Sequence, residues 1–286
     1  MYKTNTLTAQ KWIGKVQRVL VILLLLFFVA LALFPFVYMV VVSLIQDGMS
    51  MKLNWDYLSN ATWTFENYGR VIYTGSFVRY MFNSAIVALI SCVVTCLTSS
   101  LAAYGFTKKK FPGSNFAYML YLLTMMIPST VILIPLYLMI KSMGLLNSHI
   151  GIAVPYAASA FGTILMCSFM KSIPNELLES ADIDGASELR KFITIILPLI
   201  KPALISLTIF TFVSCWGSFL WPLISTTKND MQVVTVAVSR LKNDRVATNY
   251  GYVMAGSTLA FLPPFILYIF LQKQFVEGIA LSGIKG

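Results

Sequence analysis

The sequence predicts an all-α membrane protein with six transmembrane helices. Hydrophobic residues make up 58% of the 286 positions and charged residues only 11%, and the mean hydropathy is +0.78. Soluble globular proteins carry about 25% charged residues, so this composition excludes a soluble chain with one large core. The apolar residues also come in long runs rather than in alternation. Helices are expected because lipid cannot satisfy backbone groups left unpaired.

Each predicted span is a run of about twenty apolar residues, enough to cross the hydrocarbon core of a bilayer as a helix. The six runs are Val19–Leu44, Met81–Phe106, Phe116–Ile140, His149–Phe169, Pro202–Ile224 and Tyr252–Leu271. The first run is too long for the apolar part of a signal peptide, and no small-residue cleavage site follows it, so we expect it to be retained. The predicted organisation is a tail 1–18, a six-helix domain 19–271 and a tail 272–286.

The basic residues predict that both termini lie in the cytoplasm. The net charge is +10, and the lysine and arginine residues gather at the ends of apolar runs. More of them fall on the side of the N-terminus, and the run Lys108–Lys110 occupies a very short loop there. Cytoplasmic loops carry an excess of Lys and Arg, which sets this orientation. No basic face with interleaved aromatic residues is present, so nucleic acid is not an expected partner.

The six predicted spans lack the groups that several classes of membrane protein need. No Asp, Glu or Lys lies well inside a span, which argues against ion-coupled transport and voltage sensing. The sequence contains no G-x-x-x-x-G-K-[ST] phosphate loop. Its four cysteines fall in apolar runs without a His to complete a metal set. We therefore expect no catalytic site, cofactor or metal in this chain, and energy for active transport would come from another subunit.

The most distinctive segment is the polar loop 171–198 between the fourth and fifth spans, which holds five of the eleven acidic residues. Pro174 suits the first turn of a helix, and Glu176 and Glu179 suit its positive N-terminal end. Gly185 tolerates the left-handed conformation in which many helices stop. The four-residue spacing of one apolar set predicts a narrow apolar stripe on this helix. That set is Ile173, Leu177 and Ala181.

A second helix is expected from Ser187 to Leu197, after which Pro198 and Pro202 bend the chain into the fifth span. The loop could rest on lipid headgroups as an amphipathic connector. Its first half is acidic, however, and fits poorly against an anionic leaflet. We therefore favour a protein partner.

These residues also carry a family resemblance. Glu179-Ser180-Ala181, Gly185 and Ile195-x-Leu197-Pro198 keep every spacing of the E-A-A-x3-G-x9-I-x-L-P signature of ABC importer permeases, with Ser180 replacing the first alanine. The chain further resembles the carbohydrate-importer branch and its MalG-like second permease subunit. The segments that are similar are Trp63–Tyr68, Gly144–Asn147, Trp216–Leu223 and Met254–Gly286.

The resemblance implies a type I ABC importer permease bundle with a cytoplasmic coupling helix, in a bacterial cytoplasmic membrane. Its implied partners are a second permease, two ATPase subunits that hold ATP and Mg²⁺, and an extracytoplasmic solute-binding protein that meets the outer loop 225–251. The tail 272–286 would approach the ATPase pair. The residues implied to couple to the ATPase are Glu176, Glu179, Ser180, Ala181, Asp184, Gly185, Ala186, Leu197 and Pro198.

The uncharged spans suit a neutral, hydroxyl-rich solute, which favours a sugar or oligosaccharide. Trp216, Phe219 and Trp221 are candidates for stacking on sugar rings, although packing or a place in the interfacial aromatic belt is the favoured interpretation of each. Glycerol-3-phosphate or another small polar solute remains an alternative. A different class, an ATP-independent channel or structural membrane subunit, predicts no ATPase bound at the loop.

Overall fold

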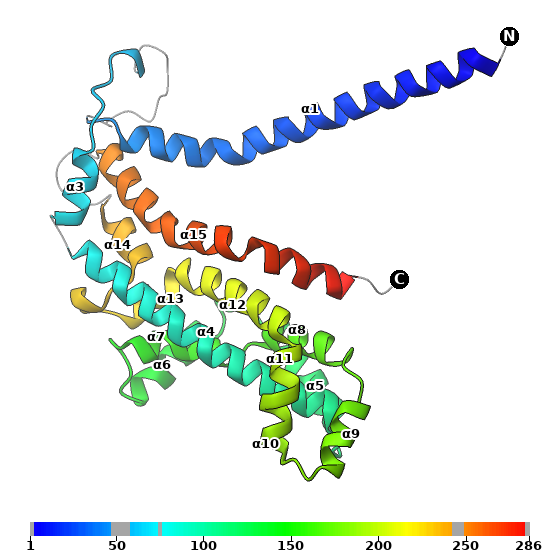
Figure 1. Ribbon diagram of the computed structural model, residues 1–286. Helices are drawn as coiled ribbons and strands as arrows, with labels where there is room; N and C mark the ends of the chain where they lie inside the picture. Colours follow the sequence, from blue (N-terminus) through cyan, green and yellow to red (C-terminus); the bar gives the residue numbers. More distant parts are fainter. Residues whose placement is uncertain (1–2, 47–57, 74–75, 242–248, 284–286) are drawn as a thin grey trace. The chain divides into compact units, whose positions relative to one another are not determined.

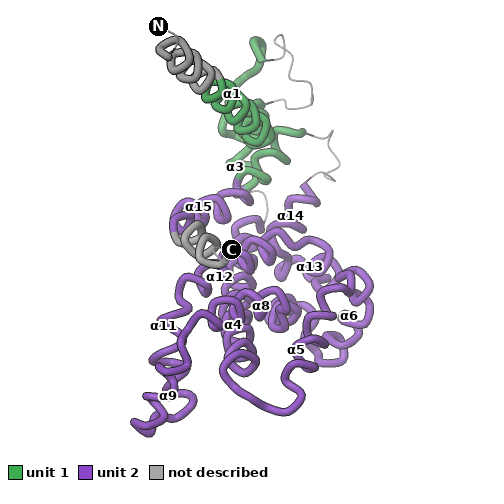
Figure 2. Tube along the Cα trace, turned by 90° about the vertical axis from the view of Figure 1, so that its right-hand side faces the viewer, with its two compact units in different colours: residues 1–71, 244–258 green, residues 72–243, 259–286 purple. Residues whose placement is uncertain are grey.

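The structure, a computed structural model, describes residues 3–46, 58–73, 76–241 and 249–283. Every regular element in these ranges is a helix, and one isolated bridge joins Ile45 to Trp63. Two compact units are present, one formed by residues 1–71 and 244–258 and the other by 72–243 and 259–286 (Figure 2). The predicted all-α class is confirmed for the described part of the chain.

The first unit contains α1 (Lys3–Ser43) and most of α3 (Glu66–Tyr73). The buried side chain of Asn67 connects α3 to the end of α1. Its Nδ2 donates to the carbonyl oxygens of Ser43 at 3.0 Å and Ile45 at 2.9 Å. A Cβ on Gly251 would lie 2.6 Å from Asn67 Nδ2, so only glycine fits there. Because α1 begins at Lys3, the predicted tail 1–18 is largely helical and continuous with the first span.

The second unit is built around α4 (Phe77–Lys108), which packs most extensively on α8 (Ala160–Met170) and α12 (Lys201–Trp216) (Figure 1). Small side chains line this contact. A Cβ on Gly162 of α8 would lie 2.5 Å from Ser99 Oγ of α4 and 3.0 Å from Leu207 of α12. Small residues let membrane helices approach closely in this way.

The other helices of the described residues, apart from those of the loop 171–198 given below, are mostly short. They are α5 (Ser114–Leu123), η1 (Thr124–Met126), α6 (Leu133–Ser142), α7 (His149–Ala153), η2 (Val154–Ala157), α13 (Leu220–Ser225), η4 (Asn229–Met231) and α14 (Val234–Leu241), followed by the long α15 (Tyr250–Gly283). Helix α15 continues past the predicted end of the sixth span at Leu271.

Three helical stretches of the described residues are long and apolar enough to cross a membrane: Gln17–Ser43, Phe77–Lys108 and Tyr250–Lys273. They match the first, second and sixth predicted spans. Two bent pairs raise the number to five if each counts as one span. These are His149–Ala157 with Ala160–Met170, bent by 48°, and Glu188–Leu199 with Lys201–Trp216, bent by 78°.

Three predicted spans are not continuous helices, and the fourth, His149–Phe169, is the first of the bent pairs above. The third, Phe116–Ile140, is interrupted between η1 and α6, where Ile127 is extended (φ −86°, ψ 117°) before Pro128. A proline disfavours helical geometry in the residue before it and lacks an N–H of its own. The fifth, Pro202–Ile224, stops as α12 at Trp216 and resumes as α13 at Leu220.

Candidate functional site

The polar loop 171–198 folds as two helical arms joined by a turn. The first arm is α9 (Glu176–Ile183). The second runs through α10 (Glu188–Lys191), the π-helical η3 (Phe192–Ile196) and α11 (Leu197–Leu199) (Figure 1). Ser187 caps the second arm by accepting the N–H of Arg190 at 3.4 Å. The predicted helix, turn and helix are all present, and the 78° bend after them lies at the predicted prolines.

The turn depends on Gly185, which has φ +72°. Its N–H donates to Asp182 O at 3.0 Å, and the N–H of Ala186 donates to Ala181 O at 2.9 Å. This pair of bonds is the Schellman arrangement, which satisfies carbonyls at the end of a helix. A Cβ at residue 185 would meet no atom within 4 Å, so the need for glycine here is conformational rather than steric.

Apolar side chains anchor both arms on the second unit. Ile173 and Leu178 are buried with Phe192, Ile196 and residues of α4, α8 and α12 in one core. The predicted stripe is wrong at Leu177, which is 43% exposed. Its reason is the helix start: α9 begins at Glu176, so Ile173 lies outside the helix and its four-residue spacing does not continue into it.

Charged side chains tie the same arms to each other and to α4. Lys191 is 1% exposed, and its Nζ donates to carboxylate oxygens of Asp182 and Glu188. Glu188 also forms an ion pair with Lys109 and accepts the Tyr104 hydroxyl at 2.9 Å. We call Lys109, Asp182, Glu188 and Lys191 the ion cluster. Its two cations and two anions balance, as a buried charge requires.

Glu188 and Lys191 stay charged at neutral pH. Hydrogen bonds from Lys109 and then Lys191 lower the pKa of the Glu188 carboxyl to about 2. The partners Asp182 and Glu188, in that order, raise the pKa of Lys191 above its usual value. Both groups lie outside the predicted spans. The brace that they form is therefore not a switch near pH 7.

Lys108 holds the entrance to the loop. Its Nζ donates to Ile173 O at 2.6 Å and to Asn175 Oδ1 at 2.9 Å. From the sequence, Lys108 and Lys109 indicated only the orientation of the chain in the membrane, and no pattern indicated that Lys191 is buried. Nothing in the spacing of these residues could have shown that they meet, because the packing of α9 and α10 on α4 brings them together.

The residues predicted to contact an ATPase lie on the outer side of this braced loop. Glu176, Glu179, Ser180, Asp184, Gly185 and Pro198 are exposed, and Ala181, Ala186 and Leu197 are partly buried. Two large apolar side chains accompany them, Ile183 at 89% and Leu189 at 64% exposure. The loop thus presents a rigid, partly acidic and partly apolar surface.

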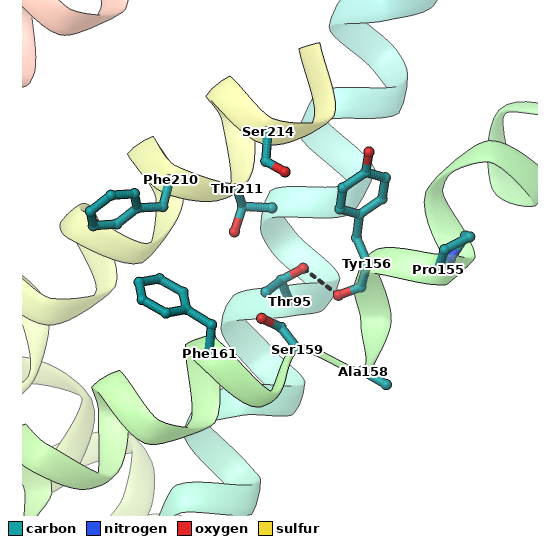
Figure 3. A pocket seen from close by; sticks show the side chains of 9 residues that line it. All are labelled: Thr95, Pro155, Tyr156, Ala158, Ser159, Phe161, Phe210, Thr211 and Ser214. Carbon is teal, nitrogen blue, oxygen red and sulfur yellow. Dashed lines mark hydrogen bonds between the residues drawn. The ribbon is translucent and has the colours of Figure 1, made fainter. Parts of the chain in front are cut away.

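Two cavities in the second unit are lined by hydroxyl and aromatic groups. The first, of about 380 Å³, is shown in Figure 3. Its lining residues are Thr95, Pro155, Tyr156, Ala158, Ser159, Phe161, Phe210, Thr211 and Ser214. The second, of about 440 Å³, shares Pro155, Tyr156 and Ser214 with it and extends to Ser129, Ser218, Phe219 and Trp221 among others. No acidic or basic side chain is among the described lining residues of either cavity.

Comparison with known proteins identifies the family of the chain. Residues 95–280, which include both arms of the loop and nearly all of the second unit's core, match the family model for the inner membrane component of binding-protein-dependent transport systems. The chain belongs to this family. It is therefore a membrane permease component of an ABC importer, whose ATP site belongs to a separate subunit.

Curated relatives of this permease are transport system permease proteins. The arabinooligosaccharides transport system permease protein AraQ of Bacillus subtilis is 32% identical, over 93% of this chain and 96% of the relative. The lactose transport system permease protein LacG of Rhizobium radiobacter is 32% identical, over 89% and 92%. The sn-glycerol-3-phosphate transport system permease protein UgpE of Agrobacterium fabrum is 31% identical, over 92% and 96%.

A solved structure shows the same fold. A chain in the crystal structure of a bacterial ABC transporter involved in the import of the acidic polysaccharide alginate aligns with a TM-score of 0.79 at 24% identity. The alignment covers 91% of the permease and 97% of that chain. The permease therefore has the type I ABC importer permease fold.

The three aromatic candidates of the permease have different surroundings. Phe219, 41% exposed, and Trp221, 7% exposed, both line the second cavity. The Trp221 Nε1 donates to Ile152 O at 3.2 Å. Trp216 lines neither hydroxyl cavity: it is 6% exposed, stacks on Phe212 at 5.3 Å and donates to Ala260 O at 2.9 Å. The geometry thus favours packing for Trp216 and keeps Phe219 and Trp221 as solute candidates.

Proposed function

We propose that the permease moves a neutral sugar or oligosaccharide inward across a bacterial inner membrane, with ATPase subunits docked on the loop 171–198. The observation that carries this proposal is the braced, outward-facing loop. Its apolar core and ion cluster join both arms to α4, α8 and α12. A docked subunit that pulls on such a loop would move these helices rather than bend the loop.

The docking surface would be formed by the exposed predicted residues together with Ile183 and Leu189. Apolar side chains surrounded by polar ones are typical of a protein interface. Glu179 would be the charged contact, and Gly185 would let the turn enter a cleft. Two ATPase subunits would hold the ATP and Mg²⁺, and a second permease would complete the path. This chain would hold no cofactor.

The uncharged cavities support a neutral solute. A phosphate group is usually held by Arg, Lys or a helix N-terminus, and the described lining residues include no cation. The relatives carry names of both kinds, for sugars and for glycerol-3-phosphate. The cavity chemistry favours the sugar over the phosphorylated solute.

The proposed topology keeps six spans with both termini in the cytoplasm. The third span would be the broken stretch from α5 to α6, satisfied by neighbouring helices as proline breaks in membrane helices are. The outer loop 225–251 would meet the solute-binding protein. Its part 242–248 lies outside the described residues, and so does 284–286 in the tail that would approach the ATPase pair.

The test is ATP-dependent uptake by the importer reconstituted with its copurifying subunits and binding protein. Labelled neutral sugars should accumulate, and labelled glycerol-3-phosphate should not. Glu179→Lys should abolish uptake and copurification of the ATPase, whereas Asp230→Lys, at an exposed carboxylate of η4 in the outer loop, should leave copurification of the ATPase intact. Uptake without any bound ATPase would favour the channel class. Phosphate-dependent uptake would overturn the sugar proposal.

A further inference from the structure

We infer that the permease itself holds the solute during transport, at a saccharide-binding site formed by the hydroxyls of Thr211 and Ser214. This inference rests on the proposed sugar import and locates a solute contact in this subunit. Both residues belong to α12 and line the first cavity. Figure 3 shows them projecting from α12 on the side of Tyr156, Thr95 and Ser159.

The decisive observation is a contrast within α12. Hydroxyls in helices usually bond to the carbonyl one turn back. Ser206 does so with Pro202 O at 3.1 Å, and Thr208 does so with Leu204 O at 2.8 Å. Figure 3 draws no hydrogen bond between the side-chain hydroxyls of Thr211 or Ser214 and the other residues that line the cavity.

Thr211 is 7% exposed, and its hydroxyl is reached from the cavity rather than enclosed in the core. Its place in the cavity lining leaves room for a partner from outside the chain. A sugar hydroxyl can donate and accept at once, so it would satisfy this group.

The opposite wall has matching groups. Ser159 Oγ accepts the N–H of Gly162 at 3.0 Å, which leaves its own hydrogen free to donate to a solute. Thr95 Oγ1 donates to Tyr156 O at 2.7 Å and keeps its lone pairs available (Figure 3). This wall therefore offers both a donor and an acceptor, which a polyol can use.

Aromatic rings provide the apolar side of the site. Phe161 and Phe210 meet edge to face, with ring centroids 5.3 Å apart. They are 43% and 37% exposed and line the same cavity. Ligand sites of about 300–1,000 Å³ typically combine such rings with a few placed polar groups. The apolar C–H face of a pyranose ring would lie on these rings.

The absence of charged side chains among the described lining residues favours neutral over anionic sugars. No charged side chain is among its described lining residues, so an anionic sugar would leave its charge unpaired. Ser214 and Tyr156 also line the second cavity. A longer saccharide could therefore extend from one cavity into the other, toward Phe219.

The test compares hydroxyl removals on one helix in the complete reconstituted importer. Thr211→Val with Ser214→Ala should lower sugar uptake about tenfold, as the loss of two hydrogen bonds predicts, while binding-protein-stimulated ATP hydrolysis persists. The control, Thr208→Val with Ser206→Ala, removes hydroxyls that are already bonded to the helix. It should retain uptake within about twofold.

The outcomes separate the two proposals. If the wild-type importer takes up no neutral sugar, the proposed function fails. If it does, and the double variant matches its control, the binding site is overturned. Ser214→Cys provides a second measurement should the double variant not assemble. Saturating sugar should protect this thiol from a methanethiosulfonate reagent, above the background of the wild-type thiols, and unchanged labelling would equally refute the site.

Discussion

Replacing Gly185 with alanine should loosen the turn of the loop 171–198 without disturbing any packing. Residue 185 has φ +72°, and a Cβ there would meet no atom within 4 Å. The cost is therefore the backbone term alone, about 1–2 kcal/mol for an L-residue in the left-handed conformation. Such a change multiplies the local opening equilibrium by about 5–30.

Hydrogen exchange measures this opening directly. The amides of residues 185 and 186 donate the two bonds that close the turn, so their protection should fall by the same factor of about 5–30. Gly185→Asn should lose less, because asparagine tolerates the left-handed region. Gly69→Ala is the matched control, since its Cβ also meets nothing within 4 Å but no left-handed conformation is required there.

Transport adds a second readout. Gly185→Val should insert and assemble yet lose uptake, because a β-branched residue fits this backbone poorly. Unchanged exchange in Gly185→Ala would refute the conformational argument. A larger loss in Gly185→Asn than in Gly185→Ala would show that side-chain volume at the partner surface matters more than backbone freedom.

Three further predictions concern other parts of the chain. Lys191→Met should raise the ATP consumed per solute severalfold, since it removes the buried cation that joins Asp182 to Glu188; Lys201→Met should not, and equal ratios would contradict the bracing role. The pairing of Glu188 with Lys191 should hold from about pH 5 to pH 10. Because the pKa of Glu188 is lowered, the stability that its charge contributes is lost only below about pH 4.3. Because the pKa of Lys191 is raised, the stability that its charge contributes is lost only above about pH 10.4. Hydrogen exchange of α9 and α10, corrected for intrinsic rates, should therefore show no step between pH 6 and 9. Trp216→Phe should lower the melting temperature through loss of the 2.9 Å bond to Ala260 but leave uptake per assembled importer within about twofold; a selective fall in uptake would place Trp216 on the solute path.

The loop was predictable because its signals are local. Gly185 ends α9, Ser187 caps α10, and Pro198 precedes the bend, each by a property of one residue and its neighbours. Leu177 and Leu178 show the limit of such signals. The spacing alone favoured the first, but the observed helix start places the second in the core.

The cavities could not be predicted in the same way. Thr95, Tyr156 and Thr211 come from different helices and meet only because of how α4, η2 and α12 pack. One sequence does not report the rotation of each helix about its axis. The break in the third predicted span was not foreseen for a related reason: hydropathy counts apolar residues and ignores the backbone break that Pro128 causes.

The π-helical turn Phe192–Ile196 bears on how this segment tolerates changes in length. Its N–H to C=O bond from Leu197 to Phe192 encloses one residue more than an α-helical turn does. Deleting one residue here would convert the segment to ordinary α-helix while α10 and α11 kept their relative rotation. Relatives that differ by one residue at this point can therefore share the same orientation of the following helix, although a strict alignment would score them as mismatched.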